Sequence, residues 1–148
     1  MKRITIIGYP EIVRKGMCGL ISARNIYSVT CFSDPVAFIK HTWAFSPDLV
    51  IMDQVMPSMN CVEAIKEIKK RWGKCKVLFC CDSSADEDIQ KAFKAGVSGY
   101  IFLDASSDEI LLSISQILSG HYYVTPLILP IILNKLCQNT KTLHSLIK

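Results

Sequence analysis

Short, continuous apolar runs alternate along the chain with longer stretches in which apolar residues recur every three or four positions. The continuous runs are Arg3–Ile7, Tyr27–Phe32, Asp48–Met52, Lys76–Cys80 and Gly99–Phe102. Runs of this length without regular alternation are typical of strands that are covered on both faces. The pattern therefore predicts five strands, most of them buried.

The stretches between these runs have helical spacing. Helices are expected over Glu11–Arg24, from Asp34-Pro35 to about Ala44, from Asn60 through Trp72, and over Ala85–Ala95 and Ser106–Ser119. In the first helix the apolar positions at helical spacing are Ile12, Val13, Met17, Leu20 and Ile21. Asp34 and Asn60 are suitable N-caps, and Gly96 is a suitable helix stop. Strands and helices therefore alternate as βα repeats.

A βα repeat with right-handed crossovers requires a parallel sheet with helices on both faces. The expected fold is α/β and flavodoxin-like: a doubly wound five-stranded parallel sheet of order 2-1-3-4-5 with an additional C-terminal helix. Ligands bind such sheets at the carboxyl ends of the strands, where the strand order reverses. This places Gly8 and Tyr9 beside Asp53, although they lie about 45 positions apart in the sequence.

The last part of the chain has a different pattern. Thr125 and Pro126 predict an N-cap and a first helical residue, opening a helix to about Cys137. Pro130 should bend its first turns. The helix is apolar nearly all round, and its expected linker or dimer positions are Leu129, Ile132, Leu133 and Leu136. Such a helix must dock on its own domain or on a second chain, so a homodimer is expected.

Length and composition are consistent with one domain and a short extension. We expect a domain over residues 1–121 and a linker, helix and tail over 122–148. Half of the 148 residues are apolar and the net charge is only +4. The densest basic stretch, from Lys66 to Lys76, is more typical of a solvated helix face than of a nucleic-acid site. No membrane-spanning run or signal peptide is present in the sequence, which indicates a cytoplasmic protein without membrane contact.

Several short motifs occur in order along the chain. They are Val13–Gly16, Pro47–Val50, Met52-Asp53 with Met56-Pro57, Ala92 with Ala95-Gly96, Gly99-Tyr100 and Asp104–Ser106. With this set the chain resembles the receiver domain of bacterial two-component response regulators, of the NarL/FixJ type, from Met1 to about Pro126. The resemblance implies a CheY-like fold and a role in phosphorelay signal transduction and transcription regulation. It also implies a histidine kinase or another signalling protein as a partner.

The resemblance also assigns roles to positions near the expected switch point. In the family, an aspartate accepts a phosphoryl group with the help of Mg²⁺, a lysine and a hydroxyl. Asp53 matches the phosphoacceptor and Tyr100 the switch aromatic, whereas Gly8 and Tyr9 replace the acidic pair that holds Mg²⁺. Cys81 stands at the hydroxyl position and Leu103 at the lysine position. The resemblance therefore implies an atypical, degenerate site with Mg²⁺ binding lost or weak, and no other cofactor.

From these replacements we hypothesise that Tyr9 fills the former metal pocket. Asp53 would then be a structural remnant, hydrogen-bonded to the backbone or to Tyr9. No catalytic triad, Cys-His pair or glycine-rich phosphate loop is present in the sequence, so an enzyme is not expected.

Two other functions stay open. One is a conventional receiver phosphorylated on Asp53, and the other is a redox or small-molecule sensor that uses Cys81 and the reshaped pocket. Strand alternation puts Cys80 and Cys81 on opposite faces, which argues against a joint role. The family's DNA-binding output domain would follow the linker helix and is not found within these residues. A piece of a transcription factor is therefore favoured over a stand-alone receiver.

Overall fold

The computed structural model describes residues 1–41, 46–53, 56, 58–81, 86–134 and 137. Within them the strands are β1 (Lys2–Ile7), β2 (Tyr27–Phe32), β3 (Leu49–Met52), β4 (Lys76–Cys81), β5 (Gly99–Phe102) and β6 (Tyr123–Val124). The helices with full bounds are α1 (Glu11–Ser22), α2 (Pro35–Lys40), α3 (Cys61–Arg71), α4 (Asp86–Ala95) and α5 (Ser107–Leu118). The strands form one parallel sheet of order β2-β1-β3-β4-β5-β6. The flavodoxin-like α/β fold and the order of the first five strands are confirmed.

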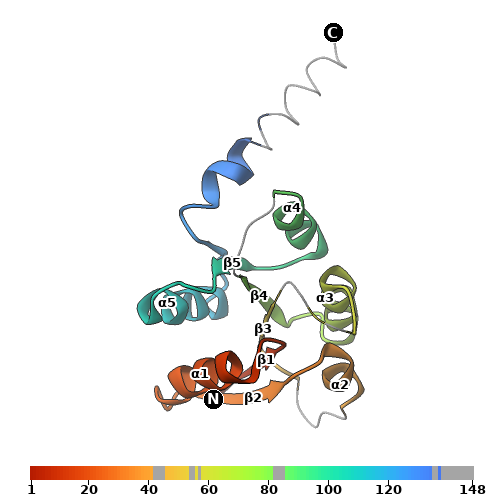
Figure 1. Ribbon diagram of the computed structural model, residues 1–148, viewed down its shortest axis with the longest axis vertical. Helices are drawn as coiled ribbons and strands as arrows, with labels where there is room; N and C mark the ends of the chain where they lie inside the picture. The colour runs from red at the N-terminus through yellow and green to blue at the C-terminus, as the bar shows by residue number, and fades with distance from the viewer. Residues whose placement is uncertain (42–45, 54–55, 57, 82–85, 135–136, 138–148) are drawn as a thin grey trace.

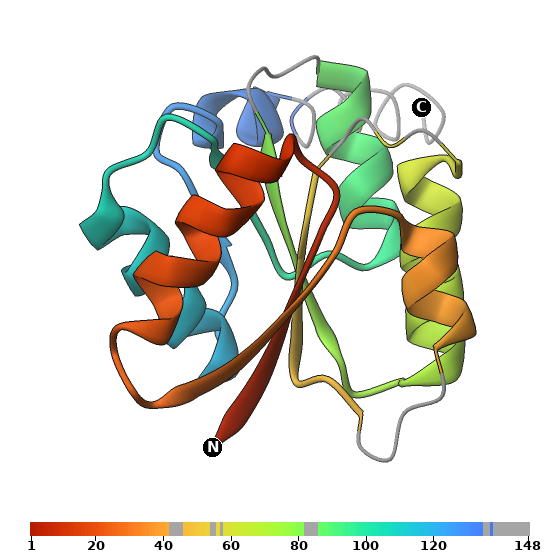
Figure 2. The same cartoon turned by 60° about the horizontal axis from the view of Figure 1, so that its bottom comes forward.

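The helices cover both faces of the sheet, with α1 and α5 on one face and α2, α3 and α4 on the other (Figures 1 and 2). Successive strand residues alternate between two cores. The buried residues of the α1/α5 core are Ile4, Ile6, Tyr9, Met17, Ile21, Leu49, Ile51, Leu78, Cys80, Ile101, Ile110, Ile114 and Ile117. Those of the α2–α4 core include Ile7, Phe38, Val50, Met52, Ile65, Ile68, Val77, Phe79, Cys81, Ile89, Tyr100 and Ile128. The expected separation of Cys80 from Cys81 is confirmed.

Three of the expected caps, Asp34, Asn60 and Gly96, begin or end helices as predicted. The Asp34 side chain accepts a hydrogen bond of 2.7 Å from the amide of Val36 at the start of α2. Asn60 accepts one of 2.8 Å from the amide of Val62 at the start of α3. Gly96 follows α4 with a φ of +109°, a left-handed conformation that favours glycine. These local signals fix where α2 and α3 begin and where α4 ends on the α2–α4 side of the sheet.

Two expectations for helices α1 and α2 were wrong. Helix α2 ends at Lys40 rather than near Ala44, because His41 takes an extended conformation with ψ at 134°. Residues 42–45 lie outside the described residues. Ile12 does not face the core: its side chain is 82% exposed. At about 100° per residue, Ile12 lies roughly 180° around α1 from Ile21, the residue buried at the other end of the helix.

The sheet has a sixth strand that the sequence pattern did not predict. Tyr123 pairs with Gly99 and Val124 pairs with Tyr100. A run of two residues is too short to show a period, so it could not be recognised from the pattern. The pairing depends on Gly99: a Cβ atom there would lie 2.8 Å from the carbonyl oxygen of Tyr123 and 2.7 Å from Cδ1 of Ile117. The strand holds the following segment against the edge of the sheet.

The C-terminal helix begins later than expected. Residues 126–128 form a turn, in which the amide of Ile128 donates to the carbonyl of Thr125 over 2.9 Å, and the helix covers 129–134. The Thr125 hydroxyl donates to Oε1 of Glu109 over 2.5 Å instead of capping this helix. Pro130 therefore lies in the first helical turn, where an amide proton has no helical partner to lose.

This segment docks on its own domain along one side only. Ile128 is fully buried in the α2–α4 core, and Ile131 and Ile132 pack against that core. The exposed apolar side chains on the other side are Leu127, Leu129 and Leu133. Leu136 lies outside the described residues. Among the helices that the structure describes, none is long and apolar enough to cross a membrane.

Candidate functional site

The predicted site residues follow the carboxyl ends of neighbouring strands. Gly8 comes directly after β1 and Asp53 directly after β3. A Cβ atom placed on Gly8 would lie 3.5 Å from the Cβ atom of Asp53, so the two residues are in contact distance. The Asp53 side chain is partly exposed. The structure thus brings together the residues that the expected strand order places at the switch point.

The turn after β1 has an unusual backbone. Gly8 has a φ of +88° and Tyr9 a φ of +70°, so two successive residues are left-handed. For Tyr9 this conformation costs about 1–2 kcal/mol. Arg14 of α1 offsets this cost: its Nη1 atom donates to the carbonyl oxygen of Gly8 over 3.1 Å and to that of Tyr9 over 3.0 Å. Sequence reasoning included Arg14 in a motif but gave it no role at the site.

The Tyr9 side chain is buried in the α1/α5 core and points to the end of β4. Its hydroxyl donates a hydrogen bond of 2.6 Å to the carbonyl oxygen of Cys80. Burial raises the pKa of Tyr9 well above 10, and the neighbouring Cys80, Cys81 and Asp53 raise it further. Tyr9 is therefore a neutral phenol, and its hydroxyl proton is used in the hydrogen bond to the carbonyl oxygen of Cys80. The hydroxyl of Tyr9 therefore does not donate to Asp53, which was one of the two arrangements expected for that carboxylate, although the two side chains are neighbours.

The cysteines at the end of β4 are both inaccessible. Cys81 is completely buried in the α2–α4 core, and Cys80 is 1% exposed in the α1/α5 core. Burial raises the pKa of the Cys80 thiol to about 12, so it stays protonated at neutral pH. A buried, protonated thiol is a poor nucleophile and a poor target for oxidants.

Leu103 places an apolar side chain at the same edge of the sheet, directly after β5. Its amide donates to the carbonyl oxygen of Cys81 over 2.6 Å, which continues the register beyond β5. Its side chain is partly buried and packs against the α1/α5 core. The edge therefore has a hydrocarbon side chain at the position where the resemblance would place an ammonium group.

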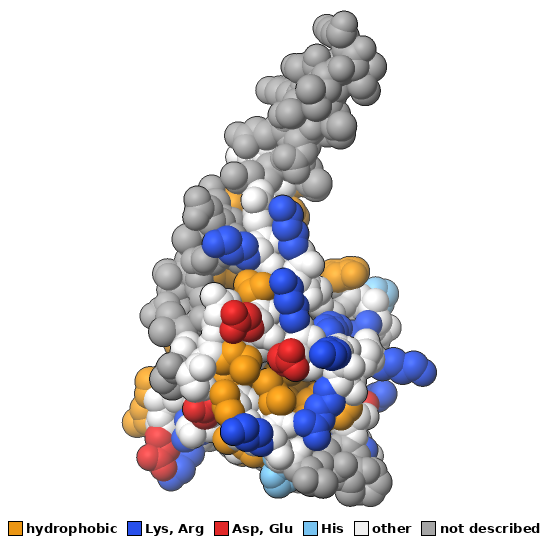
Figure 3. All heavy atoms as spheres, turned by 90° about the vertical axis from the view of Figure 1, so that its right-hand side faces the viewer, with side chains coloured by type: hydrophobic (Ala, Val, Ile, Leu, Met, Phe, Trp, Pro, Cys, Tyr) orange, Lys and Arg blue, Asp and Glu red, His pale blue; other side chains and the backbone are white. Residues whose placement is uncertain are grey.

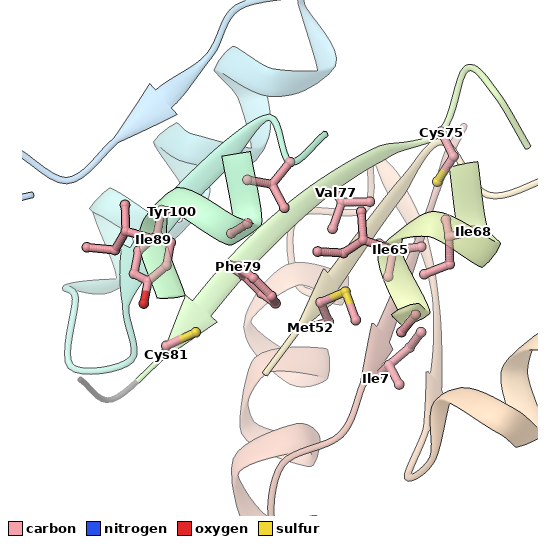
Figure 4. Packing of buried hydrophobic residues seen from close by; sticks show 14 of the residues in the cluster. Ile7, Met52, Ile65, Ile68, Cys75, Val77, Phe79, Cys81, Ile89 and Tyr100 are labelled. Carbon is pink, nitrogen blue, oxygen red and sulfur yellow. The ribbon is translucent and has the colours of Figure 1, made fainter. Parts of the chain in front are cut away.

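Tyr100 lies entirely inside the α2–α4 core. Its ring makes an edge-to-face contact with Phe79, with ring centroids 5.9 Å apart, and Figure 4 shows both rings with Ile89 on the same side of β4 and β5. The carbonyl of Tyr100 accepts a hydrogen bond of 3.0 Å from the amide of Thr125. The predicted switch aromatic is thus joined through its backbone to the C-terminal segment.

The donor set at this edge does not suit the magnesium ion that the family resemblance associates with a phosphoacceptor aspartate. Mg²⁺ prefers octahedral coordination by hard oxygen ligands, with carboxylates as the usual protein donors. Of Gly8, Tyr9 and Asp53, only Asp53 has a carboxylate, and the Tyr9 hydroxyl already donates to Cys80. No three His, Cys, Asp or Glu side chains gather as a metal-binding group anywhere in the described ranges.

Comparisons with known proteins agree with the fold. The model of the response regulator receiver domain matches residues 4–115. The chain is 26% identical over 140 residues to the nitrate/nitrite response regulator protein NarL of Escherichia coli K12, covering 94% of this chain and 65% of NarL. It is 33% identical over 128 residues to the transcriptional regulatory protein LnrK of Bacillus subtilis, covering 85% of this chain and 58% of LnrK.

A solved structure extends the comparison to three dimensions. The two-component response regulator of the LuxR family from Aurantimonas sp. SI85-9A1 superposes with a TM-score of 0.81 at 29% identity, covering 90% of this chain and 96% of that one. The chain spans less than two thirds of the length of the two curated relatives, 65% and 58%. The match to the receiver model covers most of the sheet and its helices, and the chain therefore belongs to the family of response regulator receiver domains of two-component signalling.

Proposed function

We propose that this chain is an atypical receiver domain, which controls a transcription regulator through protein contacts or dimerisation without Mg²⁺-dependent phosphorylation. The observation that carries the proposal is the buried Tyr9 side chain, with its hydroxyl bonded to Cys80, at a position where the family resemblance implies a metal-binding acid. A neutral phenol in that place supplies no charge to hold Mg²⁺.

Electrostatics around Asp53 support the same conclusion. A phosphoryl group there would bring negative charge next to Tyr9 and toward the edge lined by Leu103. Phosphoryl transfer is accelerated mainly by cations that neutralise the developing charge. The nearby Arg14 guanidinium donates to the carbonyl oxygens of Gly8 and Tyr9. Its position thus supports a structural role in the turn after β1.

The C-terminal segment supports output through a homodimer. Leu129 is 47% exposed and Leu133 is 51% exposed, whereas Ile132 packs on the same domain. A second copy that covered these leucines would remove apolar surface from water. The names of NarL and LnrK as a response regulator and a transcriptional regulator support a role in transcription. Contact with DNA would then belong to an output domain outside these 148 residues.

The first test is an amide NMR titration with Mg²⁺, followed by beryllofluoride as a phosphoryl mimic. We expect no specific shifts at Gly8, Asp53 or Cys81, because the donor set for the ion is incomplete. Shifts that spread from Asp53 to Tyr100 and the C-terminal helix would overturn the proposal. They would favour a conventional receiver phosphorylated by a histidine kinase, a second candidate supported by the partly exposed position of Asp53 after β3.

A gain-of-function variant tests whether the residues at positions 9 and 103 cause the proposed loss of Mg²⁺ binding. Tyr9→Asp with Leu103→Lys restores an acid and an amine at the site, and we expect this double variant to acquire a Mg²⁺-dependent response to beryllofluoride. The matched control is Tyr122→Asp with Leu112→Lys, at two exposed positions away from the site. If the double variant is folded, as checked by circular dichroism, and still shows no response to Mg²⁺, then Tyr9 and Leu103 are not the cause of the lost response.

The sensor alternative finds no support, since Cys81 is completely buried.

A further inference from the structure

The basic residues of α3 do not form one uniform solvated face. The Lys69 ammonium group donates to the carbonyl oxygen of Cys75 over 2.5 Å. The Arg71 guanidinium donates to the carbonyl oxygens of Ile39 and His41 and lies 5.1 Å from the centre of the Trp72 ring. These two cations stabilise the ends of α2 and α3. The other charges of the run are therefore the ones available to a partner.

Three exposed lysines converge on a groove between α3 and α4. Lys66 comes from α3, and Lys91 and Lys94 come from α4. They line a groove of about 470 Å³ together with Asn60, Val62, Glu63 and Ala95. Figure 3 shows Lys and Arg side chains gathered over the face formed by α2, α3 and α4. The groove thus combines a basic rim with apolar side chains.

The three lysines have no carboxylate partner in the part of the chain that the structure describes. The ion pair found there joins Lys15 to Glu11 on α1, far from the groove. Glu63 lines the groove without forming an ion pair with any of the three lysines. Like charges held close together repel, and an anionic partner relieves that repulsion. Among the residues that line the groove, three lysines face one glutamate, and this excess of positive charge favours an acidic occupant.

The shape of the groove favours a protein segment over a nucleic acid. The groove, with a volume of about 470 Å³, has room for a few side chains. A nucleic acid instead contacts a protein over an extended surface that follows its phosphate backbone. Glu63 would oppose a row of phosphates, and Val62 and Ala95 offer contacts that an apolar side chain can use. We propose that this groove docks an acidic segment of a partner protein, with carboxylates on the lysines and an apolar residue over Val62 and Ala95.

This docking surface is independent of the state of Asp53. It lies between two helices on the α2–α4 side of the sheet, and none of its lining residues belongs to the candidate site. The proposal therefore stands or fails separately from the proposed loss of phosphorylation, and it adds a partner of stated chemistry to the receiver.

The test uses the full chain and a fluorescein-labelled peptide of alternating glutamate and leucine pairs, with a glutamine-for-glutamate peptide as the neutral probe. Binding is followed by fluorescence anisotropy, and the site is mapped by amide NMR. The groove variant is Lys66→Gln, Lys91→Gln, Lys94→Gln. The control is Lys2→Gln, Lys40→Gln, Lys74→Gln, which removes the same charge from exposed positions outside the groove.

We expect the groove variant to bind the acidic peptide about tenfold more weakly, and the control less than about twofold more weakly. Amide shifts should centre on Val62, Lys66, Lys91 and Ala95, and the neutral peptide should not bind. Equal losses in the two variants, shifts centred elsewhere, or no binding of the acidic peptide would overturn the proposal. Tighter binding of a short DNA duplex to the same lysines would also overturn it, in favour of a nucleic acid.

Discussion

The Tyr9 hydroxyl donates a hydrogen bond of 2.6 Å to the carbonyl oxygen of Cys80, a residue 71 positions later in the chain. Tyr9 follows β1 and Cys80 belongs to β4, and β3 lies between these two strands in the sheet. The bond therefore ties the left-handed turn after β1 to a strand that is not its neighbour. It fixes the position of a bulky, neutral side chain next to Asp53.

The hydroxyl of Tyr9 should contribute measurably to stability. Tyr9→Phe keeps the ring in the α1/α5 core but leaves the buried carbonyl of Cys80 without this donor. We expect the free energy of unfolding to fall by about 1–2 kcal/mol, seen as a lower urea midpoint with an unchanged slope. Tyr122→Phe, at a side chain that is 75% exposed, should change it by less than about 0.5 kcal/mol. Equal effects of the two substitutions would contradict a structural role for the hydrogen bond.

Stability should decrease at alkaline pH. Burial raises the pKa of Cys75 and of Cys80 from 9.0 to about 12, and it raises the pKa of Tyr9 above 10. A group with a raised native pKa stays protonated in the folded chain while the unfolded chain loses its proton, so unfolding becomes easier as pH rises. The stabilisation by the thiols is complete below about pH 9 and declines from there toward 12.

The contribution of Tyr9 to this pH dependence can be separated. It is complete below about pH 10 and is lost as the pH rises toward its native pKa. Urea midpoints measured at closely spaced pH values should decline less steeply above pH 10 in Tyr9→Phe than in the unsubstituted chain. The same steepness in both proteins would show that Tyr9 ionises as readily in the folded chain as in the unfolded one.

Gly99 should not tolerate a side chain. A Cβ atom there would lie within 3.0 Å of Cδ1 of Ile117, the backbone oxygen of Tyr123 and Cδ1 of Leu78. Because one of these contacts is with backbone, Gly99→Ala should destabilise the chain by about 1–3 kcal/mol, by separating β6 from β5 or by displacing α5.

Gly16 is the matched control for that substitution. It lies inside α1, where a Cβ atom would meet nothing within 4 Å. Gly16→Ala should therefore stabilise the chain by about 0.5–1 kcal/mol, since alanine favours the helix. Thermal or urea unfolding of the two variants gives the comparison. A destabilisation of similar size in both would show that crowding between β5 and β6 is not the cause.

Self-association should depend on the exposed leucines of the C-terminal segment. Leu133→Glu places a charge on the proposed dimer surface without disturbing the α2–α4 core, and we expect the dimer to dissociate at least about tenfold more readily. Ile131→Glu should also weaken it, although this side chain packs against the core as well. Light scattering over a concentration series measures the mass.

The control for the dimer surface is Ile12→Glu, since Ile12 is exposed on α1. We expect its mass to match that of the unsubstituted chain. A dimer that Leu133→Glu leaves intact but Ile12→Glu disrupts would move the interface to α1. A monomeric unsubstituted chain at high concentration would remove the homodimer from the proposed function.

Local patterns in the sequence determined the types of most elements and their order in the sheet. Apolar runs identified β1 to β5, and Asp34, Asn60 and Gly96 marked helix ends, because these signals act through neighbours in the chain. Right-handed crossovers then predicted the strand order and the approach of Gly8 to Asp53. The position of the candidate site could therefore be predicted without coordinates.

Tertiary packing decided what local patterns do not encode. The partner of the Tyr9 hydroxyl, the strand β6 and the separation of Lys69 from Lys66 depend on residues that are distant in sequence. The orientation of α1 on the sheet left Ile12 exposed, although the sequence pattern counted it among the apolar positions at helical spacing. Periodicity reports which side of a helix is apolar, but only the packed sheet selects the residues that lose contact with water.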